Sequence, residues 1–227
     1  MSTAIPMEEL QRRYMAVYGA GPIYDALERR GLPHQVLSHN IRPLMPHMKM
    51  AGPAYTVKGV RRPPGRWEGE REVDLLGGVR PGCVIVYDPG NEQESGHWGE
   101  LTSNAAAARG AQGIVVDGGA RDAAMHLEIP NWSCFCRYTS PIEAGRRQSI
   151  VAVNVPILVG GSLTTTVEVR PNDLVFAGLC GIVVIPQEIA ADVLIEVEEI
   201  VEKEKKGRQE LRLGTPLGEI GKKYGVG

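Results

Sequence analysis

A strand, a helix and a second strand follow one another near the middle of the chain, and this alternation constrains the fold more than any other feature. Cys83–Tyr87 and Ile114–Val116 are short apolar runs bounded by turn residues, which is typical of buried strands. Between them, Thr102–Arg109 contains four consecutive alanines and predicts a closely packed helix. A βαβ unit of this kind predicts parallel strands joined by a right-handed crossover. The fold class is therefore α/β.

Other segments predict what surrounds this unit. Apolar residues at helical spacing predict two short N-terminal helices over about 7–30, interrupted at Gly19–Pro22, and a long C-terminal helix over about 187–206. Further strands are predicted at residues 50–57, 135–138, 150–154, 157–159, 164–169, 174–176 and 182–185. Because no repeat or linker interrupts residues 1–227, a single domain is expected.

Composition and charge exclude several classes of protein. The formal net charge is -2, which argues against a mainly electrostatic nucleic-acid binder. No segment approaches the roughly 20 apolar residues of a membrane span, and the N-terminus lacks a signal pattern, so a cytoplasmic protein without membrane contact is expected. Cys134 and Cys136 lack the usual zinc spacing, so we expect the four cysteines to be free thiols, most of them buried.

The segment after the first strand of the βαβ unit can bind an anion. It ends in His97–Thr102 and runs directly into the predicted helix. A helix N-terminus presents unpaired backbone N–H groups, so the amides of Glu100, Leu101 and Thr102 form a cradle for a carboxylate or phosphate. Gly99 lets a ligand approach the backbone closely. The alternative is that Glu100 only caps the helix and complements its dipole.

The segment after the second strand carries two glycines followed by adjacent opposite charges, Arg121 and Asp122. Arg121 offers a planar fork for a carboxylate or an oxyanion, and Asp122 is a hard oxygen ligand suited to Mg²⁺ or Mn²⁺. Such a pair is also common on protein surfaces. Because ligands gather at the carboxyl ends of parallel strands, the two segments are expected to meet at one edge of the sheet.

These residues resemble a known signature. Glu100, twenty intervening residues and then Arg121-Asp122 are similar to the acidic-x20-Arg-Asp motif of the 4-hydroxy-4-methyl-2-oxoglutarate/4-carboxy-4-hydroxy-2-oxoadipate aldolases, which share their fold with the regulator of ribonuclease E activity A, RraA. The resemblance covers most of residues 20–215. It continues through residues 24–27, 52–57, 98–101, 108–110, 113–118, 135–137, 139–141, 170–173 and 181–186.

The resemblance implies a single-domain swivelling β/β/α (RraA-like) fold and a divalent-metal site, most simply for Mg²⁺, with Mn²⁺ as the alternative. It implies that Asp122 holds the metal and that Glu100 binds a water coordinated to it. The backbone of Gly99, Glu100, Leu101 and Thr102 would hold the substrate carboxylate, and Arg121 its 2-keto oxygen. Arg121, Glu100 and Asp122 are thus the predicted catalytic residues.

The implied activity is that of a metal-dependent aldolase, a carbon–carbon lyase. It would cleave a small 4-hydroxy-2-oxo acid, such as 4-hydroxy-4-methyl-2-oxoglutarate, to pyruvate through a stabilised enolate, with oxaloacetate decarboxylation as a side activity. One alternative is a non-catalytic regulator that binds a ribonuclease. Another is a lyase of sugar-derived 2-oxo acids, because Ala177–Gly181 replaces an acidic Asp-x-Asp/Asn-Gly segment that family members usually carry.

The resemblance also implies a homotrimer or a dimer of trimers, with sites near subunit boundaries. A carboxylate from a neighbouring C-terminal helix could then join the site, and Glu199, Glu202 and Glu204 are the candidates.

Three further residues have open roles. His97 could move protons, although a loop histidine is more often incidental. For His126 a structural role is favoured, and Arg137 either orients the site or pairs with Asp117.

Overall fold

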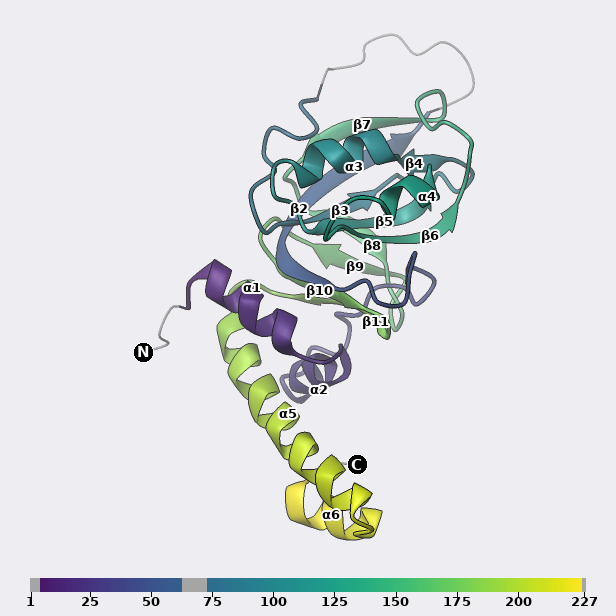
Figure 1. Ribbon diagram of the computed structural model, residues 1–227. Coiled ribbons are helices and arrows are strands. Elements are labelled where there is room, and N and C mark those ends of the chain that lie inside the picture. Colours follow the sequence, from purple (N-terminus) through teal and green to yellow (C-terminus); the bar gives the residue numbers. More distant parts are fainter. Residues whose placement is uncertain (1–4, 63–72, 226–227) are drawn as a thin grey trace.

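The computed structural model describes residues 5–62 and 73–225. In these residues the predicted βαβ unit is present, with β3 (Val84–Asp88), α3 (Glu100–Ala107) and β5 (Gly113–Ala120), and β3 pairs with β5 in parallel. The fold is mixed α/β, as predicted (Figure 1). The helix begins two residues earlier than expected, so the Gly99 backbone leads directly into it.

The strands around the βαβ unit form one strongly curved sheet. β2 (Met50–Arg61) lies beside β3 and β6 (Ser133–Thr139) beside β5, both in parallel. The other neighbour of β2 is β10 (Leu174–Gly178), which runs antiparallel and continues into β11 (Gly181–Ile185). The path β1-β6-β5-β3-β2-β10-β11 therefore contains parallel strands in its centre and antiparallel strands at its ends.

Short strands complete the architecture. β4 (Gly96–Trp98) pairs with β5 in parallel, and β7 (Gln148–Val153) pairs with β2 in antiparallel orientation. The remaining short strands are β1 (Arg42–Pro43) and the separate hairpin of β8 (Ile157–Gly160) and β9 (Thr166–Val169). Apolar residues of β8 and β9 pack with those of the main sheet in one cluster.

The N-terminal helices agree with the prediction: α1 (Met7–Ala16) and α2 (Gly21–Arg29) flank the expected break. The C-terminal helix was predicted wrongly at both ends, because α5 spans Ala190–Arg212 rather than 187–206. The residues before Ala190 form a turn, and α6 (Leu217–Tyr224) folds back on the far end of α5, where Glu210 accepts hydrogen bonds from Lys223 and Tyr224. These contacts extend the helix beyond what its apolar pattern indicates.

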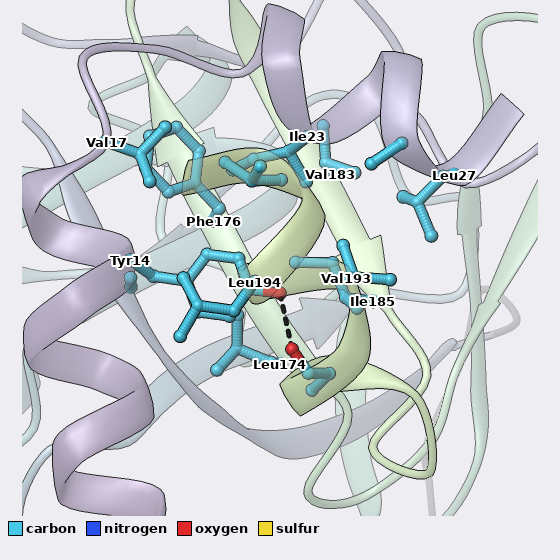
Figure 2. Packing of buried hydrophobic residues seen from close by; sticks show 14 of the residues in the cluster. Tyr14, Val17, Ile23, Leu27, Leu174, Phe176, Val183, Ile185, Val193 and Leu194 are labelled. Carbon is cyan, nitrogen blue, oxygen red and sulfur yellow. Dashed lines mark hydrogen bonds between the residues drawn. The ribbon is translucent and has the colours of Figure 1, made fainter. Parts of the chain in front are cut away.

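The helices α1, α2 and α5 cover one end of the sheet. Figure 2 shows Tyr14, Ile23 and Leu194 converging with Phe176 of β10, and the Tyr14 hydroxyl donates a hydrogen bond of 2.8 Å to the Ala190 carbonyl. A second apolar cluster lies between the strands, and a third packs α3 against the outer face of β3 and β5. Most of the buried residues in these clusters are aliphatic, although the largest fully buried side chains are aromatic, among them Trp98, Tyr14 and Tyr87.

Two sequence expectations about chemistry and membranes can be compared with the described residues. Cys83, Cys134 and Cys136 are buried free thiols, as predicted, whereas Cys180 is free and exposed. Among residues 5–62 and 73–225, no helix combines the length and the apolar character that crossing a bilayer requires.

A buried hydrogen bond between His97 and Glu92 attaches β4 and the loop before it to β5. His97 Nε2 lies 2.6 Å from the Glu92 carboxylate, and its Nδ1 accepts the Gly119 amide at 3.1 Å. Because Nδ1 is an acceptor, the proton of the neutral ring resides on Nε2 and is donated to Glu92. The Glu92 carboxylate also accepts the Glu94 and Ser95 amides. Sequence reasoning left His97 open, and the structure gives it a buried structural partner.

Burial gives this pair a measurable pH dependence. Desolvation lowers the pKa of His97 from its ordinary 6.5, although Glu92 opposes the shift. Below pH 6.5 the histidine is therefore protonated in the unfolded chain but still neutral in the folded chain. The contribution of His97 to the free energy of unfolding is full above pH 6.5 and is lost as the pH falls below it.

We predict that the free energy of unfolding falls below pH 6.5 with a contribution of up to about 1.4 kcal/mol per pH unit from His97. His97→Gln removes this contribution and makes the profile between pH 6.5 and 5 shallower. Urea denaturation at a series of pH values measures the slope. The matched control is His34→Gln, because His34 is exposed. An equal slope in wild type and His97→Gln contradicts the assignment.

Candidate active site

The carboxyl ends of β4 and β5 bring the two predicted segments to one edge of the sheet. β4 pairs in parallel with the end of β5, with Trp98 opposite Ala120. Gly99 follows Trp98 and serves as the N-cap of α3, and Arg121 follows Ala120. The two segments meet because adjacent parallel strands end at the same edge.

The first turn of α3 is open where it faces Asp122. Gly99 has no side chain that could cap the helix, and a Cβ added to it would lie 3.4 Å from Asp122 Oδ2. Leu101 in the first turn is 78% exposed. Backbone N–H groups at a helix start carry a partial positive charge and bind anions. The structure therefore places the open start of α3 beside a carboxylate, and anion binding there stays a prediction.

Arg121 and Asp122 lie at the surface of this edge. Arg121 Nε is 3.6 Å from Asp122 Oδ1, and their side chains are 40% and 43% exposed. Asp122 has φ +57° and ψ +43°, a left-handed conformation that is uncommon for a residue with a side chain, immediately before the short helix α4 (Ala123–His126). Both side chains can thus reach a small ligand from solvent.

Glu100 lies in the first turn of α3, where its side chain is held by its own helix. Asn104 Nδ2 donates to Glu100 Oε2 at 2.9 Å and to the Glu100 carbonyl at 3.0 Å. Burial lowers the pKa of His126, and the charges of Asp122 and Glu100 are among the smaller influences that oppose this shift. Glu100 therefore belongs to this edge, in a fixed orientation.

The expected loop at residues 117–119 is part of a strand, and this prediction was wrong. β5 continues to Ala120 through a shift of register between Val116 and Gly119. An added Cβ at Gly119 would lie 2.4 Å from the Ser95 carbonyl oxygen and 2.5 Å from the Tyr138 ring. This glycine is therefore required for close packing of β5 against its neighbours rather than for a turn.

Asp117 and Arg137 form an ion pair on adjacent strands, which selects one of the two roles left open for Arg137. Arg137 Nε donates to Asp117 Oδ1, and Asp117 Oδ2 accepts the Gly160 amide at 2.7 Å. The pair joins β5, β6 and the end of β8. These contacts stabilise the sheet, and none of them involves Gly99, Arg121 or Asp122.

A second buried histidine connects the two halves of the site. Trp98 Nε1 donates to Ser103 Oγ at 2.9 Å, Ser103 Oγ lies 3.2 Å from His126 Nδ1, and His126 Nε2 lies 3.0 Å from the Arg121 carbonyl oxygen. Burial lowers the pKa of His126, against the opposing influence of the Arg121 and Trp98 carbonyls. The structural role favoured for His126 is consistent with these contacts.

Sequence reasoning missed Ser103, Trp98 and Glu92. Ser103 is a polar residue on the buried side of an alanine-rich helix, three positions before the buried Ala106. That placement is a signal in itself, because a buried hydroxyl needs a hydrogen-bond partner. The partner, however, lies 23 residues further along the chain, and no local pattern indicates it.

The side chains at this edge could bind the expected metal through only a few carboxylates. Within the described ranges, no three His, Cys, Asp or Glu side chains are grouped so that they could hold an ion. Mg²⁺ nevertheless binds many proteins through one or two carboxylates and keeps several waters. The exposed Asp122 carboxylate, with Glu100 on the same edge, fits that mode and does not fit a dedicated all-protein cage such as a structural zinc site.

The three C-terminal glutamates lie elsewhere in the same chain. Figure 1 shows α5 extending away from the sheet on the side opposite α3 and α4. Glu204 accepts the Tyr18 hydroxyl and lies 3.4 Å from Arg208 Nη1, and Glu202 pairs with Lys206 at 3.6 Å. Glu199, Glu202 or Glu204 could therefore contribute to the site only from a neighbouring subunit. Both this contribution and the homotrimer stay predictions.

Comparisons with known proteins agree with this architecture. The family model described as RraA-like, Aldolase/RraA, matches residues 21–184. A protein of Halalkalibacterium halodurans named "Putative 4-hydroxy-4-methyl-2-oxoglutarate aldolase" is 33% identical over 172 residues, which cover 76% of this chain and 74% of that protein. Protein DlpA of Legionella pneumophila is 27% identical over 202 residues, 89% of this chain, but the chain spans only 32% of the length of DlpA.

A solved structure has the same fold. The crystal structure of Streptomyces coelicolor RraAS2, described as an unusual member of the RNase ES inhibitor RraA protein family, matches with a TM-score of 0.76 at 26% identity, over 91% of this chain and 98% of that one. The model match covers well over half of the chain, and it includes β4, α3, β5 and the Arg121-Asp122 pair. The chain therefore belongs to the RraA-like (Aldolase/RraA) family.

Proposed function

We propose that the chain is a divalent-metal-dependent aldolase that cleaves a small 4-hydroxy-2-oxo acid to pyruvate. The observation that carries the proposal is the meeting of three groups at one open edge: the uncapped start of α3, the Arg121 guanidinium and the Asp122 carboxylate. The family membership and the name of the Halalkalibacterium halodurans relative support an aldolase as the activity.

Substrate binding follows from the backbone and Arg121. The carboxylate of the 2-oxo acid binds the N–H groups of Glu100, Leu101 and Thr102 at the start of α3. This places the adjacent C2 oxygen toward Arg121, whose planar guanidinium donates hydrogen bonds in a fixed fork. Because the Arg121 side chain is 40% exposed, it is free to turn from Asp122 toward the ligand.

The chemistry requires stabilisation of negative charge on the C2 oxygen. As the C4 hydroxyl loses its proton, the C3–C4 bond breaks, C4 becomes a carbonyl, and the electron pair moves to the C2 oxygen as the enolate of pyruvate. Arg121 donates to that oxygen as its charge develops, and preorganised donors of this kind commonly account for several kcal/mol of barrier lowering. Protonation of C3 then gives pyruvate. Loss of CO₂ from oxaloacetate forms the same enolate, so it is the expected side reaction.

Asp122 would hold the divalent cation, Mg²⁺ first and Mn²⁺ as the alternative. When bound there, the cation supplies Lewis-acid polarisation of the C2 oxygen and acidifies water. Glu100, fixed by Asn104, orients a water that takes the proton from the C4 hydroxyl.

A second candidate function is ribonuclease regulation by protein binding. It is favoured by the structural match to RraAS2, whose description refers to an RNase ES inhibitor family. A nuclease inhibition assay with purified ribonuclease E separates the two functions. Inhibition that persists in Arg121→Ala would assign it to a surface other than the candidate site.

The replaced segment Ala177–Gly181 bears on which acid is cleaved. In the structure it comprises the end of β10, the two-residue turn of Leu179 and Cys180, and the first residue of β11. Leu179 is 56% exposed, and its carbonyl oxygen lies 3.4 Å from Arg42 Nη1. An apolar segment replaces an acidic one, which leaves two substrate classes open. Assays with 4-hydroxy-2-oxo diacids and with sugar-derived 2-oxo acids decide between them.

We predict that Arg121→Ala lowers kcat for pyruvate release by about 10²- to 10³-fold, because the enolate loses its donor. A dehydrogenase-coupled assay with 4-hydroxy-2-oxo diacids and oxaloacetate measures it. Arg109→Ala is the matched control, since Arg109 lies at the opposite end of α3 and is exposed.

Asp122→Asn is expected to remove the activity together with its response to Mg²⁺ and EDTA. Absence of metal-dependent pyruvate release from every 2-oxo acid tested refutes the lyase.

We predict that Gly99→Ala folds normally but binds substrate weakly. The backbone at Gly99 has φ -104°, which alanine adopts without strain, and the nearest atom to an added Cβ is Asp122 Oδ2 at 3.4 Å. The methyl group would instead occupy space beside the cradle. KM is expected to rise about tenfold or more while the melting temperature stays within about 2 °C. An unchanged KM would show that the substrate does not approach this backbone.

A further inference from the structure

The main chain of Arg121 is hydrogen-bonded at both its N–H and its carbonyl oxygen, the first directly to Trp98 and the second to His126. The Arg121 N–H donates to the Trp98 carbonyl oxygen at 2.9 Å. The Arg121 carbonyl oxygen accepts from His126 Nε2 at 3.0 Å. His126 in turn is linked through Ser103 to the Trp98 indole. The hydrogen bonds therefore form a closed ring of four residues, Trp98, Ser103, His126 and Arg121.

The direction of each bond in the ring is determined by its chemistry. A carbonyl oxygen only accepts, so His126 Nε2 carries the proton and donates to Arg121. Burial lowers the pKa of His126 and favours the neutral ring, in which Nδ1 is an acceptor and the Ser103 hydroxyl donates to it. The indole N–H of Trp98 only donates, and it fills the acceptor position of the same hydroxyl. Every member is satisfied by a neutral histidine in one tautomer.

The ring is sealed from water. Trp98 is 1% exposed, and Ser103 and His126 are fully buried. In such surroundings an unpaired polar group is strongly unfavourable, so removal of one member leaves the others without partners and loosens the whole arrangement. The ring therefore resists displacement of the Arg121 main chain relative to the start of α3.

The position of the ring relates it to the candidate site. Trp98 immediately precedes Gly99, Ser103 lies one residue after the cradle amides, and Arg121 immediately precedes the left-handed Asp122. The ring thus joins the two strand ends that must present the cradle, the guanidinium and the carboxylate in a fixed relation. A misplacement of about 1 Å in such an arrangement lowers rates by as much as 10²-fold.

We propose that Ser103 and His126 are positioning residues, which set the place of Arg121 and Asp122 relative to the anion cradle of α3 through this ring. The proposal rests on the proposed lyase function for its catalytic consequence. Its structural half, the tethering of the Arg121 peptide, can be measured without any turnover.

The first measurement is amide hydrogen exchange of the intact chain by NMR. Ser103→Ala and His126→Leu are expected to speed exchange of the Arg121 amide at least tenfold relative to amides in the centre of β3 and β5. Ser133→Ala is the matched control, because Ser133 is a buried serine that donates at 3.2 Å to the Lys49 carbonyl at the opposite end of the sheet. The wild-type ring of His126 is expected to show the Nε2–H tautomer in its ¹⁵N shifts. General destabilisation would speed all these amides together, and that result overturns the proposal.

The second measurement is steady-state kinetics well below the melting temperature. Ser103→Ala and His126→Leu are expected to lower kcat about 10- to 100-fold with KM changed less than threefold, whereas Ser133→Ala stays within twofold of wild type. His126→Gln, which can donate to Arg121 and accept from Ser103, is expected to recover much of the loss. Unchanged kcat in Ser103→Ala and His126→Leu overturns the positioning role. If wild type turns over no 2-oxo acid, the lyase proposal fails, and the exchange data alone then decide whether the ring tethers Arg121.

Discussion

The parallel pairing of β4 with the end of β5 is the contact on which the candidate site depends. Trp98 lies opposite Ala120, so the residues that follow them, Gly99 and Arg121, leave the sheet side by side. A helix starts at one strand end and a left-handed turn at the other. This pairing brings the start of α3 next to a charged pair that lies about twenty residues further along the sequence.

β4 is only three residues long, and strands this short need support from side chains. The support comes from two buried neutral histidines with opposite surroundings. His97 donates to a carboxylate and accepts a backbone amide of β5, whereas His126 donates to a backbone carbonyl and accepts a hydroxyl. The Gly119 amide requires an unprotonated Nδ1 in His97, and burial lowers the pKa of both rings, which favours their neutral form. The same low-dielectric surroundings that favour these bonds make their loss unfavourable, which keeps the edge of the sheet rigid.

The functional groups themselves are exposed, in contrast to their supports. Arg121 and Asp122 are about two-fifths exposed, and Leu101 beside them is largely exposed. This division is what the proposed binding of a small anion requires. Rigid buried groups set the position of the backbone, and exposed groups supply charge, since a net charge of -2 provides no general attraction for an anion.

Much of the fold could be predicted because it depends on local patterns. Short apolar runs separated by glycine, proline and asparagine marked β3, β6, β10 and β11, and the glycine-proline break separated α1 from α2. Predictions failed where tertiary contacts override local signals. Gly118 and Gly119 resembled a turn but belong to β5, because neighbouring strands pack too closely for side chains there, and α5 continues to Arg212 because α6 covers its far end.

For the site, the sequence by itself determined which groups are available: a glycine before a helix, an arginine and an aspartate after a strand, and the spacing that resembles a family signature. Parallel topology then placed them at one edge. Only the tertiary structure decided what holds them in place, because the links among Trp98, Ser103, His126 and Arg121 join residues up to 23 positions apart. A local pattern can indicate that a polar residue is buried, but the partner of its hydrogen bond depends on three-dimensional contact.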